Sequence, residues 1–86
     1  MSKSNPRVNS LIIQVVEKQL RDNLPPETAE TLRRLMAEGF AEEVSKQLIG
    51  SAIVAEMYHV LKSSTPFNSK RYIALLDKLP SLPGPE

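Results

Sequence analysis

Apolar residues recur three or four positions apart along nearly the whole chain, which is the spacing of a helix face. No stretch alternates apolar and polar residues in the way a half-buried strand does. Prolines, a glycine and polar turns divide the pattern into four segments. We expect helices over about 6–23, from 26 to shortly before Gly39, over 42–62, and from 69 to Pro80. The pattern therefore predicts an all-α fold, a compact four-helix bundle with two long helices, the first and third, and a Pro-rich C-terminal tail.

The ends of these segments carry the residues that start and stop helices. Asn5 is suited to cap the first helix. Pro6 fits the first helical position, where an N–H is not needed. Gly39 fits the left-handed residue that ends the second helix. Asn68 is predicted to cap the fourth helix, with its side-chain oxygen accepting from the N–H of residue 70 or 71. These signals indicate where the helices lie, and they carry no chemistry.

The chain has 86 residues, which is room for one small domain. We expect this domain to span 5–80, with 1–4 and 81–86 as flexible ends. Eleven basic and ten acidic residues give a net charge of +1, a balance that disfavours nucleic acid or an anionic membrane as a partner. Residues 1–10 lack the apolar core of a signal peptide, and no run approaches the ~20 apolar residues of a membrane span. We therefore expect a cytoplasmic protein with no membrane partner.

Glu56 and His59 have the spacing of metal ligands on a helix. At i, i+3 their side chains project from one face, as ligands do in di-iron helical bundles. A single Glu-x-x-His arises easily by chance, and the chain has one His and no Cys. We expect no catalytic residue, no cofactor and no metal, and Glu56 and His59 remain as metal-ligand candidates. A metal-dependent or hydrolytic enzyme that uses these two residues is an alternative function.

Glu56 also lies on an apolar stripe of the third predicted helix, with Ile49, Ala52, Ile53 and Val60. A buried carboxylate is costly without a partner. The sequence offers three candidate partners, Arg33, Arg34 and Lys18. The alternative is that Glu56 stays hydrated at the rim of a helix interface.

The third predicted helix is apolar on more than one side, whereas a stripe of ~100° is enough to dock a helix in a monomeric core. The second helix is short and its apolar stripe is narrow, so we expect one side of the third helix to stay uncovered in a monomer. The small residues Gly50 and Ser51 would allow a close helix contact. We therefore expect a homodimer. Its predicted interface residues are Ile49, Ile53, Met57 and Val60.

The function that best fits these features is a non-enzymatic protein-interaction or scaffold module that acts as a homodimer. A small helix-turn-helix-like DNA-binding regulator is a second alternative, with Gly39 in the turn. Its recognition helix would begin with Glu42 and Glu43, whose charge has the wrong sign to meet DNA. We therefore expect no nucleic acid partner.

Several short motifs at the starts and ends of the predicted helices are spread over residues 5–83. They are Asn5-Pro6, Gln19 to Asn23, Pro25 to Thr28, Arg34 to Gly39, Phe67-Asn68, Arg71-Tyr72 and Leu79-Pro80. Together they resemble a family of short, uncharacterised bacterial all-helical proteins. The motifs are mostly helix caps and stops, so the resemblance implies a fold and supplies no catalytic or binding residues. The chain departs from it at Ala41, where a capping Ser or Thr is expected, and this implies a weakly capped third helix.

Overall fold

The computed structural model describes residues 6–81 and contains four helices in this range. They are α1 (Pro6–Asp22), α2 (Pro26–Ala37), α3 (Glu42–Ser63) and α4 (Ser69–Lys78). No strand occurs among the described residues, and the prediction of an all-α bundle with four helices is confirmed. The observed ends lie within a residue or two of the predicted ones. The expected cap at Asn5 and most of the Pro-rich tail lie outside the described residues.

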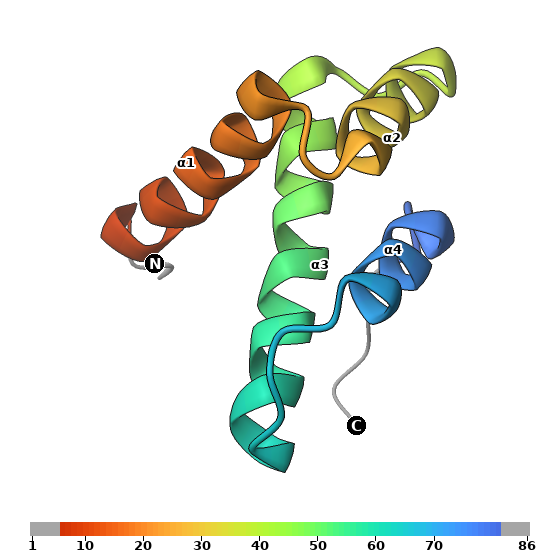
Figure 1. Cartoon of the computed structure of the whole chain (residues 1–86). Helices are drawn as coiled ribbons and strands as arrows, with labels where there is room; N and C mark the ends of the chain where they lie inside the picture. Colours follow the sequence, from red (N-terminus) through yellow and green to blue (C-terminus); the bar gives the residue numbers. More distant parts are fainter. Residues whose placement is uncertain (1–5, 82–86) are drawn as a thin grey trace.

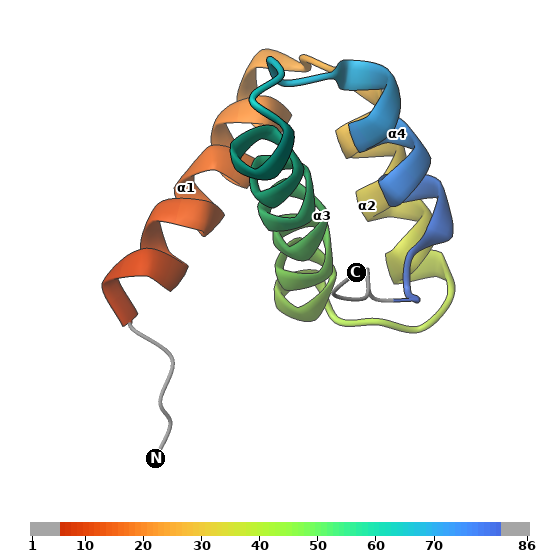
Figure 2. The ribbon, with the colours of Figure 1, turned by 90° about the horizontal axis from the view of Figure 1, so that it is seen from below.

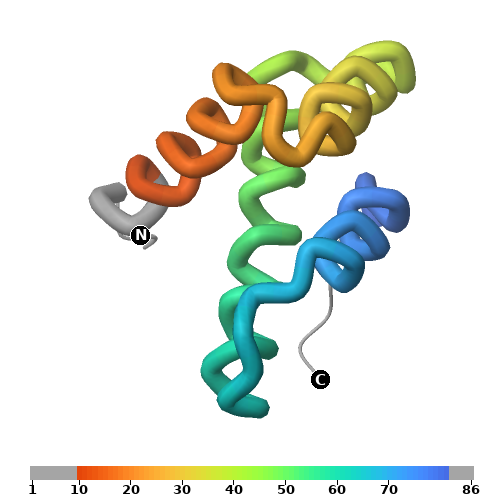
Figure 3. Tube along the Cα trace, viewed as in Figure 1, coloured from red at the N-terminus to blue at the C-terminus, as the bar shows by residue number. Residues whose placement is uncertain are grey.

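The helix α3 runs through the middle of the molecule and contacts the other three helices (Figure 1). Seen along its axis, α1 lies on one flank of α3, while α2 and α4 lie together on the other flank (Figure 2). Figure 3 shows that the C-terminal end of α1 lies beside the start of α3 and that the two helices diverge from there, so that α3 extends well past α1. One side of the C-terminal half of α3 is therefore not covered by α1.

The core forms where the middle of α3 meets its neighbours. One face of each helix is buried, because partly buried Leu20 of α1 and Leu32 of α2 pack beside the fully buried residues at helical spacing. The fully buried apolar residues are Val16 from α1, Leu35 from α2, Ile49, Ala52 and Ile53 from α3, and Tyr72, Leu76 and Leu79 from α4 and its end. The core is thin, as expected for a chain of this length.

Gly50 is the point at which α1 crosses α3. A Cβ atom built on Gly50 would lie 2.8 Å from Cγ2 of Ile12 and 3.9 Å from Cγ2 of Val16. The absence of a side chain therefore lets the two helices approach closely. A close helix contact at Gly50 was predicted, and the structure shows that the approaching helix is α1 of the same chain.

Helix α2 ends as its sequence predicts. Gly39 has φ 108°, a conformation that L side chains rarely adopt. The N–H of Gly39 donates to the carbonyl of Met36, and the N–H of Phe40 donates to the carbonyl of Leu35. These two bonds form a Schellman motif, which satisfies the last carbonyls of the helix. At the start of α3, Ala41 contributes no side-chain cap, as the sequence analysis expected.

Asn68 caps α4 in the predicted way. The N–H of Arg71 donates to Oδ1 of Asn68 at 3.1 Å. Replacing Asn68 by Ala is expected to lower the free energy of unfolding by about 1 kcal/mol, because this N–H loses its acceptor. Urea denaturation measures the loss. Asn68→Ser is the control, since a serine hydroxyl can accept the same bond, and equal losses in the two variants would contradict the capping role.

Candidate functional site

Glu56 is the most deeply buried charged residue among those described, with 1% of its surface exposed. Arg71 from α4 donates to both of its carboxylate oxygens, from Nε to Oε1 at 3.0 Å and from Nη2 to Oε2 at 2.8 Å. The backbone N–H of Asn68 donates to Oε2 at 2.8 Å. Of the two alternatives left open by the sequence, the structure shows the buried one: Glu56 is buried and paired.

The partner of Glu56 is not one of the three predicted candidates. Lys18 pairs instead with Asp22 on the surface of α1 at 2.8 Å. Arg34 donates to the carbonyls of Leu79 and Leu76, each at 2.9 Å, and so caps the C-terminal end of α4. The guanidinium charge at this end also suits the helix dipole. The interpretation of Arg34 as a partner of Glu56 was therefore wrong, and its role is to fasten α4 to α2.

The surroundings of Glu56 keep it ionised. Burial raises the pKa of its carboxyl, but the hydrogen bonds from Arg71 and Asn68 and the charge of Arg71 outweigh burial and hold this pKa below its ordinary value. Arg71 also donates to the carbonyl of Pro66 at 3.3 Å. The ion pair therefore fixes the loop between α3 and α4 as well as the first turn of α4.

The predicted metal candidates do not form a cluster. His59 is exposed, whereas the oxygens of Glu56 are engaged by Arg71 and Asn68. In residues 6–81 no group of three or more His, Cys, Asp or Glu side chains is arranged to hold a metal ion. A metal at Glu56 would have to displace Arg71 and leave its guanidinium without this carboxylate.

A second polar group joins three helices inside the molecule. The hydroxyls of Tyr72 and Thr28 each lie 2.8 Å from Oε1 of Gln19 and donate to it. Each hydroxyl has one hydrogen, so Gln19 accepts both and the 3.3 Å contact between the two hydroxyls adds no further bond. Burial raises the pKa of Tyr72, which keeps the phenol protonated as a donor. These three residues were not predicted from the sequence as a group.

The four predicted interface residues have different fates in the structure. Ile49 and Ile53 are buried in the core of the single chain, so their side chains are not available to a second copy. Val60 is half-buried, and Met57 is exposed. Of the four, Met57 is thus the one whose side chain is mainly exposed in the single chain.

The uncovered side of α3 carries four large apolar residues at i, i+3, i+4 and i+7. They are Val54, Met57, Tyr58 and Leu61, which are 49, 47, 58 and 80% exposed. We refer to these four residues as the α3 stripe. Three of them follow Gly50 by four, seven and eleven positions, so the stripe continues the face on which α1 crosses α3.

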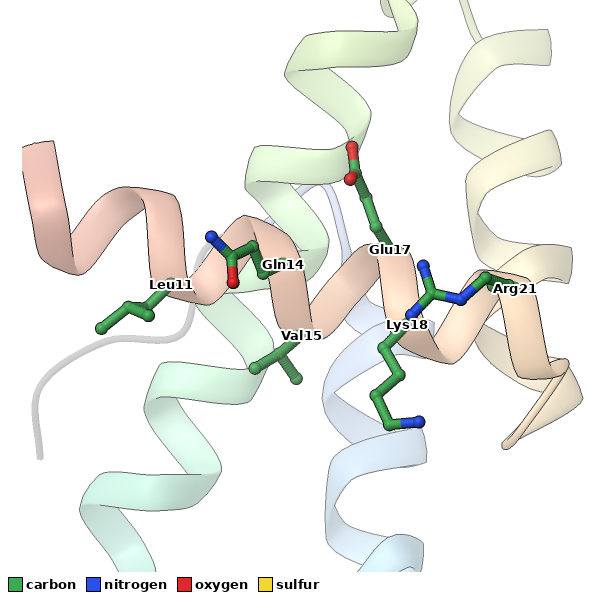
Figure 4. A pocket seen from close by; sticks show the side chains of 6 residues that line it. All are labelled: Leu11, Gln14, Val15, Glu17, Lys18 and Arg21. Atoms are coloured by element: carbon green, nitrogen blue, oxygen red, sulfur yellow. The ribbon is translucent and has the colours of Figure 1, made fainter.

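Helix α1 adds two exposed apolar residues. Leu11 and Val15 are 55 and 40% exposed and lie one turn apart. Figure 4 shows both pointing away from Glu17, towards the side on which the C-terminal half of α3 continues. Glu17 points the other way and contacts Lys46, in the N-terminal half of α3, at 3.4 Å. Leu11 and Val15 therefore lie on the opposite side of α1 from the residue that contacts the N-terminal half of α3.

A surface depression lies on the outer side of α1 (Figure 4). Its lining residues all come from that helix: Leu11, Gln14, Val15, Glu17, Lys18 and Arg21. Small-molecule sites bury most of their ligand in a concave cavity, which the side chains of a single helix do not form. The depression is therefore better described as part of an open helix surface.

The residues considered for DNA contact are arranged unfavourably. Glu42 and Glu43 are exposed at the start of α3. The ammonium of Lys46 lies 3.4 Å from carboxylates of both Glu17 and Glu42. The charged side chains in the first two turns of α3 are therefore exposed carboxylates and a lysine that is paired with carboxylates.

Among residues 6–81, none of the helices is both long enough and apolar enough to cross a membrane. Comparison of the chain with protein-family models, with curated proteins and with solved structures found no match. The resemblance to short bacterial helical proteins therefore stays a prediction from the sequence.

Proposed function

We propose that this chain is a non-enzymatic protein-interaction or scaffold module that acts as a homodimer. The observation that carries the proposal is the α3 stripe, four large apolar side chains that are about half exposed or more on one helix face. Scattered apolar residues are normal on protein surfaces, whereas a contiguous apolar patch marks an interaction site. We also propose a cytoplasmic location and a relationship to the short bacterial helical proteins that the chain resembles. Both of these proposals are supported by the sequence alone.

The chemistry of the stripe suits contact with another apolar helix face. Its side chains are aliphatic, thioether and phenol, and Lys62 lies beside it with its ammonium 5.9 Å from the centre of the Tyr58 ring. Covering a side chain that is about half exposed gains roughly 1 kcal/mol, half the value for full burial. Leu11 and Val15 are two further exposed apolar side chains, on α1. Several such side chains on each of two chains give a driving force suited to a reversible dimer.

The alternative functions have less support from the geometry. An enzyme that uses Glu56 and His59 would require the carboxylate that Arg71 and Asn68 occupy. A DNA-binding regulator would have to present α3 with Glu42 and Glu43 at its leading end. The interaction module requires no rearrangement of the residues described.

The test of this proposal is the mass of the protein in solution. Sedimentation equilibrium at micromolar to millimolar concentration is expected to show a dimer in reversible equilibrium with the 9.6 kDa chain. Met57→Lys is expected to weaken the dimer about 100-fold or more, because each dimer would desolvate two ammonium groups of like charge. A monomer at all concentrations in the unmodified protein would overturn the homodimer.

Val44→Lys is the matched control for this experiment. Val44 lies on the same helix and is 44% exposed, against 47% for Met57, but it is not part of the α3 stripe. The two variants therefore add the same charge at equally exposed positions. If both weaken the dimer to the same degree, added charge explains the effect and the stripe is not the interface.

A further inference from the structure

The arrangement of α1 on α3 determines how a second copy can reach the α3 stripe. At Gly50 the face is already occupied, since a Cβ there would lie 2.8 Å from Ile12. From Val54 to the end of the helix the same face is open, as its exposed side chains show. The exposed part of this face of α3 is thus bounded by α1 on the side of Gly50 and is uncovered towards the C-terminal end of α3.

We propose that two copies of the chain pair through their α3 stripes in antiparallel orientation, with the two-fold axis between residues 57 and 58. This inference rests on the proposed homodimer and specifies its geometry. The stripe is symmetric about that point, since its members lie at 54, 57, 58 and 61. Leu61 of one copy then packs against Val54 of the other, while Met57 of each copy lies level with Tyr58 of the other. The two copies of Met57 are therefore only one residue apart along the helix.

The length of α3 fits this register. Helix α3 ends at Ser63, and Ser64 has φ 56°, which turns the chain out of the helix. In the antiparallel pair, Ser63 of the second copy comes level with Ala52. The second helix therefore ends about two residues short of Gly50, where α1 begins to cover the face.

A parallel pair does not fit the same face. In register, it would place the N-terminal half of the second α3 beside Gly50, in the space that Ile12 and the rest of α1 occupy. The antiparallel pair instead places the exposed Leu61 of the second copy level with Val54, on the part of the face that α1 leaves uncovered. It also sets the two helix dipoles in opposition.

Disulfide cross-linking of the full-length protein tests this geometry, because the chain has no cysteine of its own. Three single variants, Met57→Cys, Val54→Cys and Leu61→Cys, are oxidised at a concentration at which sedimentation shows the dimer. Met57→Cys is expected to form a covalent dimer with itself. Two copies of residue 61 lie seven residues apart along the helix, about 10 Å, which exceeds the ~7 Å between Cα atoms that a disulfide spans. Leu61→Cys and Val54→Cys alone are therefore expected to remain uncross-linked.

A mixture of Val54→Cys and Leu61→Cys is expected to form a covalent heterodimer, which a peptide tag on one variant makes visible by its size. Efficient self-linking of Leu61→Cys would show a parallel pair and overturn the inference. A dimer by mass in which neither Met57→Cys nor the mixture cross-links would also overturn it, while leaving the homodimer intact. A monomer by mass would instead reject the proposed function. Val44→Cys is the control and is expected to form no covalent dimer.

Discussion

Replacing Arg71 by methionine is expected to lower the free energy of unfolding by about 3 kcal/mol at neutral pH. Methionine keeps much of the apolar stem of Arg71 but leaves the carboxylate of Glu56 buried with a single donor, the N–H of Asn68. Removing one member of a buried ion pair costs about 3–5 kcal/mol, and the lower part of that range applies because Arg71 itself is one-third exposed. Equilibrium denaturation in urea measures the change.

The double variant Glu56→Gln with Arg71→Met separates the lost attraction from the unpaired charge. A glutamine can still accept from the N–H of Asn68 through its amide oxygen, and no buried charge remains. We expect the double variant to be more stable than Arg71→Met alone, since much of the loss comes from the unpaired carboxylate. If Arg71→Met loses less than about 1 kcal/mol, Glu56 is hydrated in solution and this account of the ion pair is wrong.

Acid should act in opposite directions on the unmodified protein and on Arg71→Met. In the unmodified protein the pKa of Glu56 is held below its ordinary value of 4.5, so its contribution is present above that value and is lost as the pH falls through the folded-state pKa. Without Arg71, burial is opposed only by Asn68, and we expect the pKa of Glu56 to rise above its ordinary value. Protonation then stabilises the folded variant. The stability difference between the two proteins should therefore narrow as the pH falls towards 4.5, where the variant takes up its proton, and narrow further below 4.5, where the unmodified protein loses the contribution of Glu56. A constant difference would contradict this linkage.

Much of the fold follows from residues at the helix ends that favour the start or the end of a helix. Pro26 suits the first turn of α2, where no N–H is needed, while Gly39 and Asn68 act through hydrogen bonds within a few residues of themselves. Such signals do not depend on how the helices pack. The number, order and approximate bounds of the helices were therefore predictable from the sequence alone.

The partner of Glu56 was not predictable in this way. Its burial follows from its place on an apolar stripe of α3, but Arg71 lies fifteen positions later, beyond a loop whose direction the sequence does not encode in any simple pattern. One signal was available, since Asn68 and Arg71 begin the helix that follows α3 and must return along it. The triad of Gln19, Thr28 and Tyr72 joins three helices and left no such local signal.

The uncovered side of α3 was predicted to exist, and its residues were predicted only in part. A helix that is apolar on several sides shows that more than one side is buried, but it does not show which side its own chain covers. Ile49 and Ile53 are covered by neighbouring helices, while Tyr58 and Leu61 are left exposed. The crossing point at Gly50 decides this, because it fixes where α1 lies and how far along α3 its cover extends.

Gly50→Val is expected to lower the free energy of unfolding by about 2 kcal/mol. The first side-chain atom already meets Cγ2 of Ile12 at 2.8 Å, and this methyl group is attached directly to a branched Cβ and cannot swing away without a rotamer change or a shift of α1. Overpacking of this kind costs about 1–3 kcal/mol. The better helix propensity of valine over glycine returns only a few tenths of a kcal/mol. Thermal or urea denaturation measures the net loss.

A second substitution on α1 shows whether the loss arises at the crossing point. Ile12→Ala removes the methyl group that the new side chain would meet, so Gly50→Val should cost less in that background than in the unmodified protein, by about 1 kcal/mol or more. Equal costs in the two backgrounds would place the strain elsewhere. The α3 stripe is available only while α1 crosses α3 at Gly50. A double variant that regains stability but no longer dimerises, unlike the unmodified protein, would therefore indicate that α1 has moved over the α3 stripe.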